Sequence, residues 1–225
     1  MQRKSNNQIK NEVLRELWWD SRIGWHDVEE LDVAVHEGVV TLTGTVTSYA
    51  KKMAAQEAAH RVAEVLDVAN DIEVKPTREQ IRTDTEIAEA VRGALKWDAL
   101  VPDENITSDV SDGWVTLEGR VHALREREDA ERVVRRLLGV RGLSNRIVVI
   151  PVKVKPHELR ADIEAALERR ADREAERIRV EVSDGTVDLW GRVHSWQERR
   201  AVVGSISHAP GVSTVNDHLC IDPYF

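Results

Sequence analysis

One twelve-residue motif is written three times in this chain. It spans Val35–Val46, Val110–Val121 and Val182–Val193, and the first glycines of successive copies lie 75 and then 72 residues apart. A repeat of that length indicates several copies of one small domain rather than a single large fold. The 225 residues therefore divide into three modules. We place their boundaries at residues 5–76, 83–152 and 156–222.

Each module shows helical periodicity, then two alternating stretches, then helical periodicity and a last alternating stretch. In the second copy, Ile87, Val91 and Leu95 recur at steps of four and predict an amphipathic helix. Val115 and Leu117 alternate with polar residues, as in a strand with one buried face. The pattern predicts an α+β class with three tandem αββαβ domains, each a two-layer sandwich with two helices on one face of a three-stranded sheet. It leaves the strand order open.

Two glycines recur in every copy of the motif. The first follows an acidic residue in copies one to three and predicts a tight hairpin, because glycine accepts a positive φ without a Cβ clash. The second lies in phase with the inward-facing residues, so we expect a helix backbone to approach it closely, or a bulge. These turn and packing glycines are Gly38, Gly44, Gly113, Gly119, Gly185 and Gly191.

Composition excludes several classes of function. The net charge of −8 lacks the surplus of Lys and Arg that nucleic-acid binding needs. A single cysteine, Cys220, excludes a disulfide framework and a cysteine-built metal site. No Ser-His-Asp arrangement or phosphate-binding glycine loop is present, so we expect no enzyme and no resident cofactor. Because no signal peptide or transmembrane segment is found, we expect a cytoplasmic protein, or a periplasmic one only if the chain is a processed form.

Four apolar residues are candidates for an interface. Trp114 and Trp190 lie out of phase with the inward residues, and Val148 and Ile150 share the outward face in the second module. An uncovered apolar patch usually marks an interface. Packing between neighbouring modules is the favoured interpretation, because modules this small bury little core alone. A protein partner or a dimer surface is the alternative, since Trp is a frequent anchor there.

Four further tryptophans, Trp18, Trp19, Trp25 and Trp97, fall near the ends of the first helices. We expect them to close the local core like a lid, and a membrane-interface role is the alternative.

The second helix of the second module carries a basic set that could meet an anionic surface, comprising Arg125, Arg132, Arg135 and Arg136. Acidic residues interleave with these arginines, which favours a solvated helix with alternating ion pairs.

The combined pattern resembles the BON domain, a bacterial module named after an osmotically inducible protein and nodulation proteins. The resemblance rests on the acidic-Gly-x-Val-x-Leu-x-Gly-x-Val motif, on Gly139-Val140 and Gly211-Val212, and on Asn70 and Asn145 before the last strand. The first copy departs by having Glu64 at the Gly position, and the third by having Asp217 at the Asn position. The resemblance implies a non-enzymatic binding or adhesion module linked to osmotic or envelope stress and to phospholipid surfaces.

Three hypotheses follow. The leading one is a tandem stress-associated binding protein that acts through lipid-surface or protein contacts. The second is a cytoplasmic potassium sensor, as one relative with a BON domain is, with carbonyl and carboxylate ligands in turns such as Asp67–Asp71 or Gly139–Gly142. The third is a structural subunit that self-associates through Trp114 or Trp190.

Overall fold

The computed structural model describes residues 3–170 and 178–224, and the side chains up to residue 167 and from 178. Module 1 contains α1 (Asn6–Trp19), α2 (Trp25–Glu29), β1 (Leu31–His36), β2 (Val39–Val46), α3 (Tyr49–Ala59), β3 (Asp67–Asn70) and β4 (Glu73–Val74). Module 2 contains α4 (Asp84–Trp97), a short 3-10 turn (Asp103–Asn105), β5 (Ile106–Ser111), β6 (Trp114–Val121), α5 (Leu124–Val134) and β7 (Gly142–Val149). Module 3 contains α6 (Pro156–Arg170), β8 (Arg179–Ser183), β9 (Thr186–Val193), α7 (Trp196–Ile206) and β10 (Thr214–Ile221).

The αββαβ prediction is confirmed in all three modules, and the strand order is now defined. The second strand lies in the centre of each sheet, antiparallel to the first strand and parallel to the last. The second helix is therefore the crossover that joins two parallel strands. In module 1 the last strand is split into β3 and β4, which both pair with β2. Module 1 has three more residues between Leu17 and β1 than module 2 has between Leu95 and β5, and α2 forms in this longer segment.

Each module has its own hydrophobic core between sheet and helices. The predicted helix stripe is fully buried in module 2, where Ile87, Val91 and Leu95 are at most 3% exposed. Val115 and Leu117 face these helix residues from β6 and are inaccessible to solvent. Capping boxes at Ser5 and Thr83 start α1 and α4.

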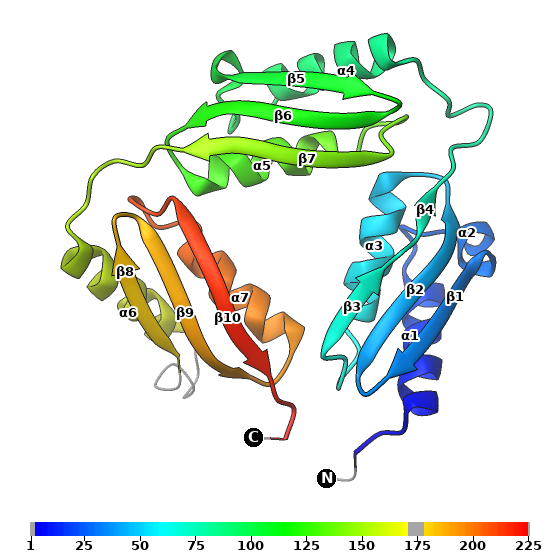
Figure 1. The fold of residues 1–225 in the computed structure, drawn as a ribbon, viewed down its shortest axis with the longest axis horizontal. Coiled ribbons are helices and arrows are strands. Elements are labelled where there is room, and N and C mark those ends of the chain that lie inside the picture. The colour runs from blue at the N-terminus through cyan, green and yellow to red at the C-terminus, as the bar shows by residue number, and fades with distance from the viewer. Residues whose placement is uncertain (1–2, 171–177, 225) are drawn as a thin grey trace.

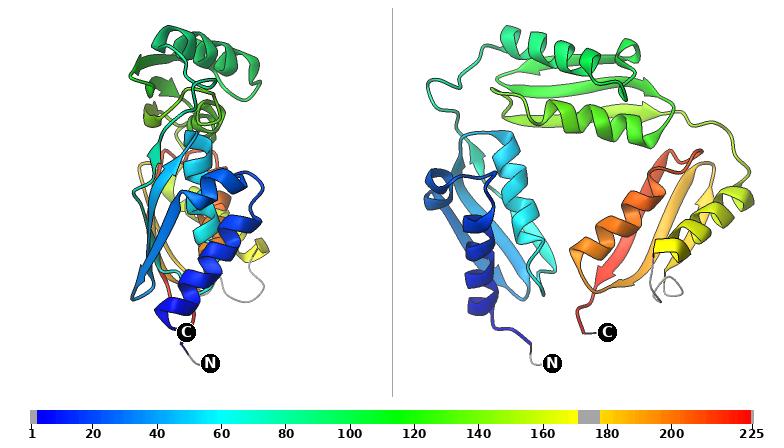
Figure 2. Two further views of the ribbon diagram at one scale, coloured as in Figure 1. Left: turned by 90° about the vertical axis from the view of Figure 1, so that its right-hand side faces the viewer. Right: turned by 180° about the vertical axis from the view of Figure 1, so that it is seen from behind.

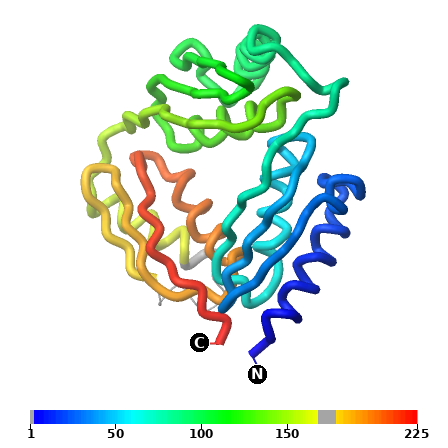
Figure 3. Tube along the Cα trace, turned by 45° about the vertical axis from the view of Figure 1, so that its right-hand side comes forward, coloured from blue at the N-terminus to red at the C-terminus, as the bar shows by residue number. Residues whose placement is uncertain are grey.

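The three modules form a flat triangular plate (Figure 1). All three sheets lie toward one broad side of the plate, and the helices lie toward the other (Figure 2). The second helices α3, α5 and α7 line the inside of the triangle, while α1, α4 and α6 lie on its perimeter. The two termini come side by side, which closes the triangle between modules 1 and 3 (Figure 3).

Candidate interaction surfaces

The modules meet through one residue position that occurs once in each. Tyr49, Leu124 and Trp196 are the first residues of α3, α5 and α7. Tyr49 packs against the core of module 2, and Leu124 is buried within the core of module 3. Trp196 stacks on His60 of module 1, with ring centroids 3.8 Å apart. Each module thus places the start of its second helix against the next module.

Polar contacts accompany each of these joints. Arg135, the C-cap of α5, lies 3.6 Å from Glu57 of α3. His208, just beyond the end of α7, lies 2.9 Å from Arg125 at the start of α5. The ends of α7 and α3 therefore meet the starts of α5 and α7, so that opposite ends of these helix dipoles face one another. At joint 1–2, by contrast, Arg135 at the end of α5 reaches the last turn of α3. We name the contacts joint 1–2, joint 2–3 and joint 3–1 after the modules that they connect.

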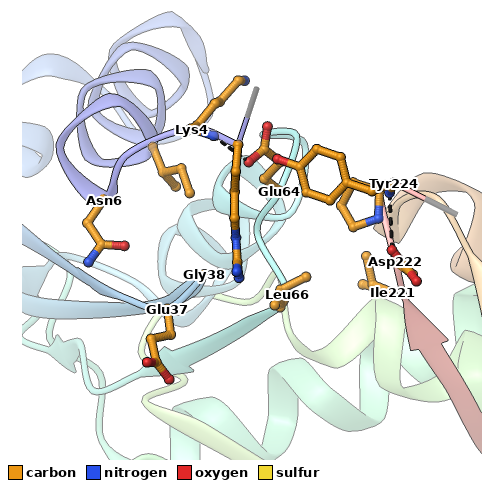
Figure 4. Close-up of a pocket in the computed structure, with 12 residues that line it drawn as sticks. Lys4, Asn6, Glu37, Gly38, Glu64, Leu66, Ile221, Asp222 and Tyr224 are labelled. Carbon is orange, nitrogen blue, oxygen red and sulfur yellow. Dashed lines mark hydrogen bonds between the residues drawn. The ribbon is translucent and has the colours of Figure 1, made fainter. Parts of the chain in front are cut away.

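Joint 3–1 is the one that no linker spans, and the chain termini complete it. The Lys4 backbone N–H donates to Glu64 at 2.9 Å, and the pKa of Tyr224 is raised by burial and by the hydrogen bond of its hydroxyl to the same carboxylate (Figure 4). These residues border a cavity of about 670 Å³. Glu64 has φ of 70°, a conformation that costs a non-glycine residue of order 1 kcal/mol. Where modules 2 and 3 have Gly, module 1 therefore has a carboxylate that accepts hydrogen bonds from residues near both ends of the chain.

A proline follows the last strand of each module, so the chain leaves all three modules in a similar way toward a joint. Pro76 and Pro151 follow β4 and β7 by two residues, and Pro223 follows β10 at the same spacing. The first two prolines lie in the linkers to the next module. Pro223 instead leads toward module 1, and it lines the same cavity as Lys4 and Glu64.

The sheet-face candidates do not form one patch. Trp114 is 51% exposed and pairs with Gly142, whereas Val148 is 56% exposed and pairs with Arg120. These pairs are six residues apart along the strands, or roughly 20 Å. The indole of Trp114 lies over Gly142, where an added Cβ would come within 2.2 Å of the ring, and its N–H donates to Ser144.

The other two sheet-face candidates lie just past the end of β7 and on the central strand of module 3. Ile150 is 46% exposed just past the end of β7 and leads into the linker. Trp190 is partly covered by its own sheet, because it stacks on His218 and lies under Arg179. The proposal that these residues contact a partner stays untested.

The basic set of α5 is mostly engaged within the chain. Arg125 and Arg132 pair with the buried carboxylate of Asp129 at 3.1 and 2.8 Å. Arg135 belongs to joint 1–2, as described above. Arg136 is the exposed member of the four. The structure therefore does not present the set as one free surface.

The recurring glycines have the expected structural roles. The hairpin glycines and the acidic residues before them all have positive φ, including 51° at Asp112 and 76° at Gly113. The close approach at the second glycine is also observed, but the approaching atom is a carbonyl oxygen before the first strand. A Cβ on Gly44 would lie 2.0 Å from the Glu30 oxygen, and one on Gly119 would lie 2.1 Å from that of Asn105.

The polar position that is Asn in modules 1 and 2 and Asp in module 3 belongs to the last strand and also has a structural role. Asn145 donates to the backbone carbonyl of Arg127 at 3.0 Å and accepts from the backbone of Ile147, so it ties α5 to β7. Asp217 in module 3 keeps the second contact and pairs with Arg199 of α7 at 2.6 Å. The departure therefore exchanges a hydrogen bond for an ion pair at the same place.

The expectation that the helix-end tryptophans close the local core is wrong. Trp19 and Trp97 are 86% and 89% exposed, and Trp18 and Trp25 are more than half exposed. Trp19 and Trp97 are the last residues of α1 and α4, so they occupy equivalent positions in modules 1 and 2. Their position two residues beyond the buried stripe, which ends at Leu17 and Leu95, was the sequence signal for exposure.

Within residues 3–170 and 178–224, no three His, Cys, Asp or Glu side chains gather to hold a metal ion, and no helix is long and apolar enough to cross a membrane. The expected turn at Asp67–Asp71 is wrong, because its first four residues form β3.

Comparison with known proteins agrees with this architecture. The family model for the BON domain matches residues 5–76, 83–151 and 157–223. Osmotically-inducible protein Y of Escherichia coli is 28% identical over 120 residues, which are 52% of this chain and 60% of that protein. An uncharacterized protein encoded in the gshII 5′ region of Anaplasma centrale is 29% identical over 133 residues, 58% of this chain and 85% of its own length. The C-terminal domain of the Chlamydia trachomatis type III secretion protein CdsD aligns with 98% of this chain and 100% of its own length. The TM-score of 0.27 and the identity of 11% are too low to indicate a shared fold.

Fold and joints define a tandem array of three small α+β modules. The chain belongs to the BON-domain family and contains three tandem copies of that domain. It is distantly related to osmotically-inducible protein Y, of which it spans about three fifths.

Proposed function

We propose that this chain is a non-enzymatic binding protein of the osmotic or envelope stress response that attaches to lipid surfaces. The family is generally non-catalytic, and the Escherichia coli relative is named for osmotic induction, which supports the stress assignment. The observation that carries lipid attachment is the near-complete exposure of Trp19 and Trp97 at equivalent helix ends.

Tryptophan favours the boundary between lipid and water, because its ring is apolar and its N–H is polar. Trp18 and Trp25 add exposed aromatic area in module 1, and Leu100 adds exposed aliphatic area in module 2, four residues after the exposed Lys96. Burying half of a ring of ~200 Å² at ~25 cal/mol/Å² stabilises attachment by about 2.5 kcal/mol. Two modules of one chain then attach together, so that two weak contacts give a stronger one.

Flotation with vesicles of phosphatidylcholine and phosphatidylglycerol tests the proposal. The unaltered protein floats with the vesicles, and the Trp19→Ala/Trp97→Ala variant loses about tenfold or more in affinity per ring. Trp114→Ala is the matched control, because it removes an exposed ring from the sheet side and leaves attachment unchanged. Absence of flotation at low salt overturns the proposal, and loss of flotation in Trp114→Ala alone moves the contact to the sheet face.

A further inference from the structure

Joint 3–1 depends on a histidine that is held in its neutral form. His60 is the C-cap of α3, is 6% exposed, and stacks on Trp196. Its Nδ1 lies 2.9 Å from Nη2 of Arg200 on α7. A guanidinium only donates hydrogen bonds, so Nδ1 accepts and carries no proton. The proton of the neutral ring is therefore on Nε2, which is buried without a partner among the described residues.

Protonation of this ring is incompatible with the joint as it stands. A second proton on Nδ1 removes the acceptor for Arg200 and places two cations 2.9 Å apart in a buried contact. Burying like charges without a counterion is strongly unfavourable. Separation of modules 1 and 3 relieves this, because water then solvates both groups.

The surrounding charges do not offset the repulsion. Arg199 of α7 also faces His60, and its own ion pair with Asp217 at 2.6 Å occupies it. Asp67 of β3 and Glu57 of α3 favour the protonated ring. Glu57 is already paired with Arg22 at 2.6 Å. Burial and then Arg200 dominate, and together they lower the pKa of His60 from 6.5 to about 4.

We propose that joint 3–1 is an acid-released latch in which His60 senses the proton and the contact with Trp196 and Arg200 breaks. Joints 1–2 and 2–3 are spanned by linkers, so the triangle opens at joint 3–1 into a chain of three folded modules. The latch is independent of lipid attachment, because Trp19 and Trp97 are not part of joint 3–1.

The sign follows from proton linkage. The closed joint has the lower pKa, so closure releases a proton and is favoured at high pH. Closure is fully supported above the pKa of 6.5 for a free imidazole and weakens as the pH falls toward 4. The difference between these two pKa values corresponds to a loss of up to about 300-fold in the closure equilibrium.

Small-angle X-ray scattering on the full chain between pH 7.5 and 4.5 tests the latch, with far-UV circular dichroism to follow the folding of the modules. The maximum dimension of the unaltered protein increases with falling pH while the dichroism stays constant. His60→Phe keeps an aromatic ring against Trp196 and cannot be protonated, so this variant stays compact throughout. Arg200→Gln keeps a hydrogen-bond donor without the charge, so closure lowers the pKa of His60 less than in the unaltered protein. The closure equilibrium of this variant therefore changes less between pH 7.5 and 4.5.

His208→Phe is the matched control, since His208 makes the similar contact with Arg125 at joint 2–3, which a linker spans. This variant opens with acid as the unaltered protein does. The proposal is overturned if the unaltered protein keeps its dimensions to pH 4.5. It is also overturned if His60→Phe and Arg200→Gln, both folded at neutral pH, open with the same pH profile as the unaltered protein.

Discussion

Replacing Leu124 by Ala tests whether the joints are structural parts of the modules. Leu124 begins a helix of module 2, yet its side chain is 8% exposed and lies in the core of module 3. Truncating a buried Leu to Ala costs about 2–5 kcal/mol, depending on how far the site relaxes. Because a boundary between two modules relaxes more readily than a closed core, we expect a cost of about 2–3 kcal/mol.

Hydrogen exchange distinguishes this reasoning from an ordinary core defect. The Leu124→Ala variant is expected to lose amide protection in β8, β9 and β10 more than in β5 and β6, although the substitution lies in module 2. Leu138→Ala is the control, because Leu138 is 50% exposed and its truncation should cost less than about 0.5 kcal/mol. Loss of protection confined to module 2 would refute the assignment of this side chain to the neighbouring core.

Four further substitutions have definite expected outcomes. Gly119→Ala places a Cβ against a backbone carbonyl at a residue with positive φ, and urea titrations should show a loss of about 2 kcal/mol or more in the free energy of unfolding. Gly93 lies in α4 with open space around it, so Gly93→Ala should raise the free energy of unfolding by up to ~1 kcal/mol in the same titrations. Thr83→Ala removes the capping box of α4, and thermal unfolding should show a loss of ~1 kcal/mol. The hydrogen bond from Arg22 lowers the pKa of Asp20 well below its usual value of 3.8. The ionised Asp20 carboxylate therefore stabilises the fold above pH 3.8, and this stabilisation is lost as the pH falls below 3.8 toward the lowered pKa. Asp20→Asn should therefore lose roughly 1–3 kcal/mol at pH 7 and show a weaker pH dependence of stability below pH 4.

Periodicity was sufficient to predict the inside of each module. The stripe of Ile87, Val91 and Leu95 and the alternation of Val115 and Leu117 each report on a single buried face, and the structure buries these residues. Strand order was not accessible, because alternation says which side of a strand is buried and nothing about its neighbours. Because alternation reports the buried side of a strand, the pattern did predict which face of each sheet the helices cover.

The joints could not be found from periodicity within one module. Tyr49, Leu124 and Trp196 lie just before their helices' buried stripes, and each contacts the next module around the triangle. Their signal is a comparison between copies, since all three are large and occupy the same repeat position. The exposed Trp19 and Trp97 were misjudged because a large apolar residue at a helix end is usually covered, and here the stripe had already ended.

Glu64 contacts residues near both ends of the chain, and this proximity makes a circular permutation of the protein feasible. Since Lys4 and Tyr224 reach the same carboxylate, a short peptide could tether the two termini without moving a module. New ends could then be cut between modules 1 and 2, in the segment 77–82. Such a circular permutant would keep the contacts of all three joints with the three domains in a different order along the chain.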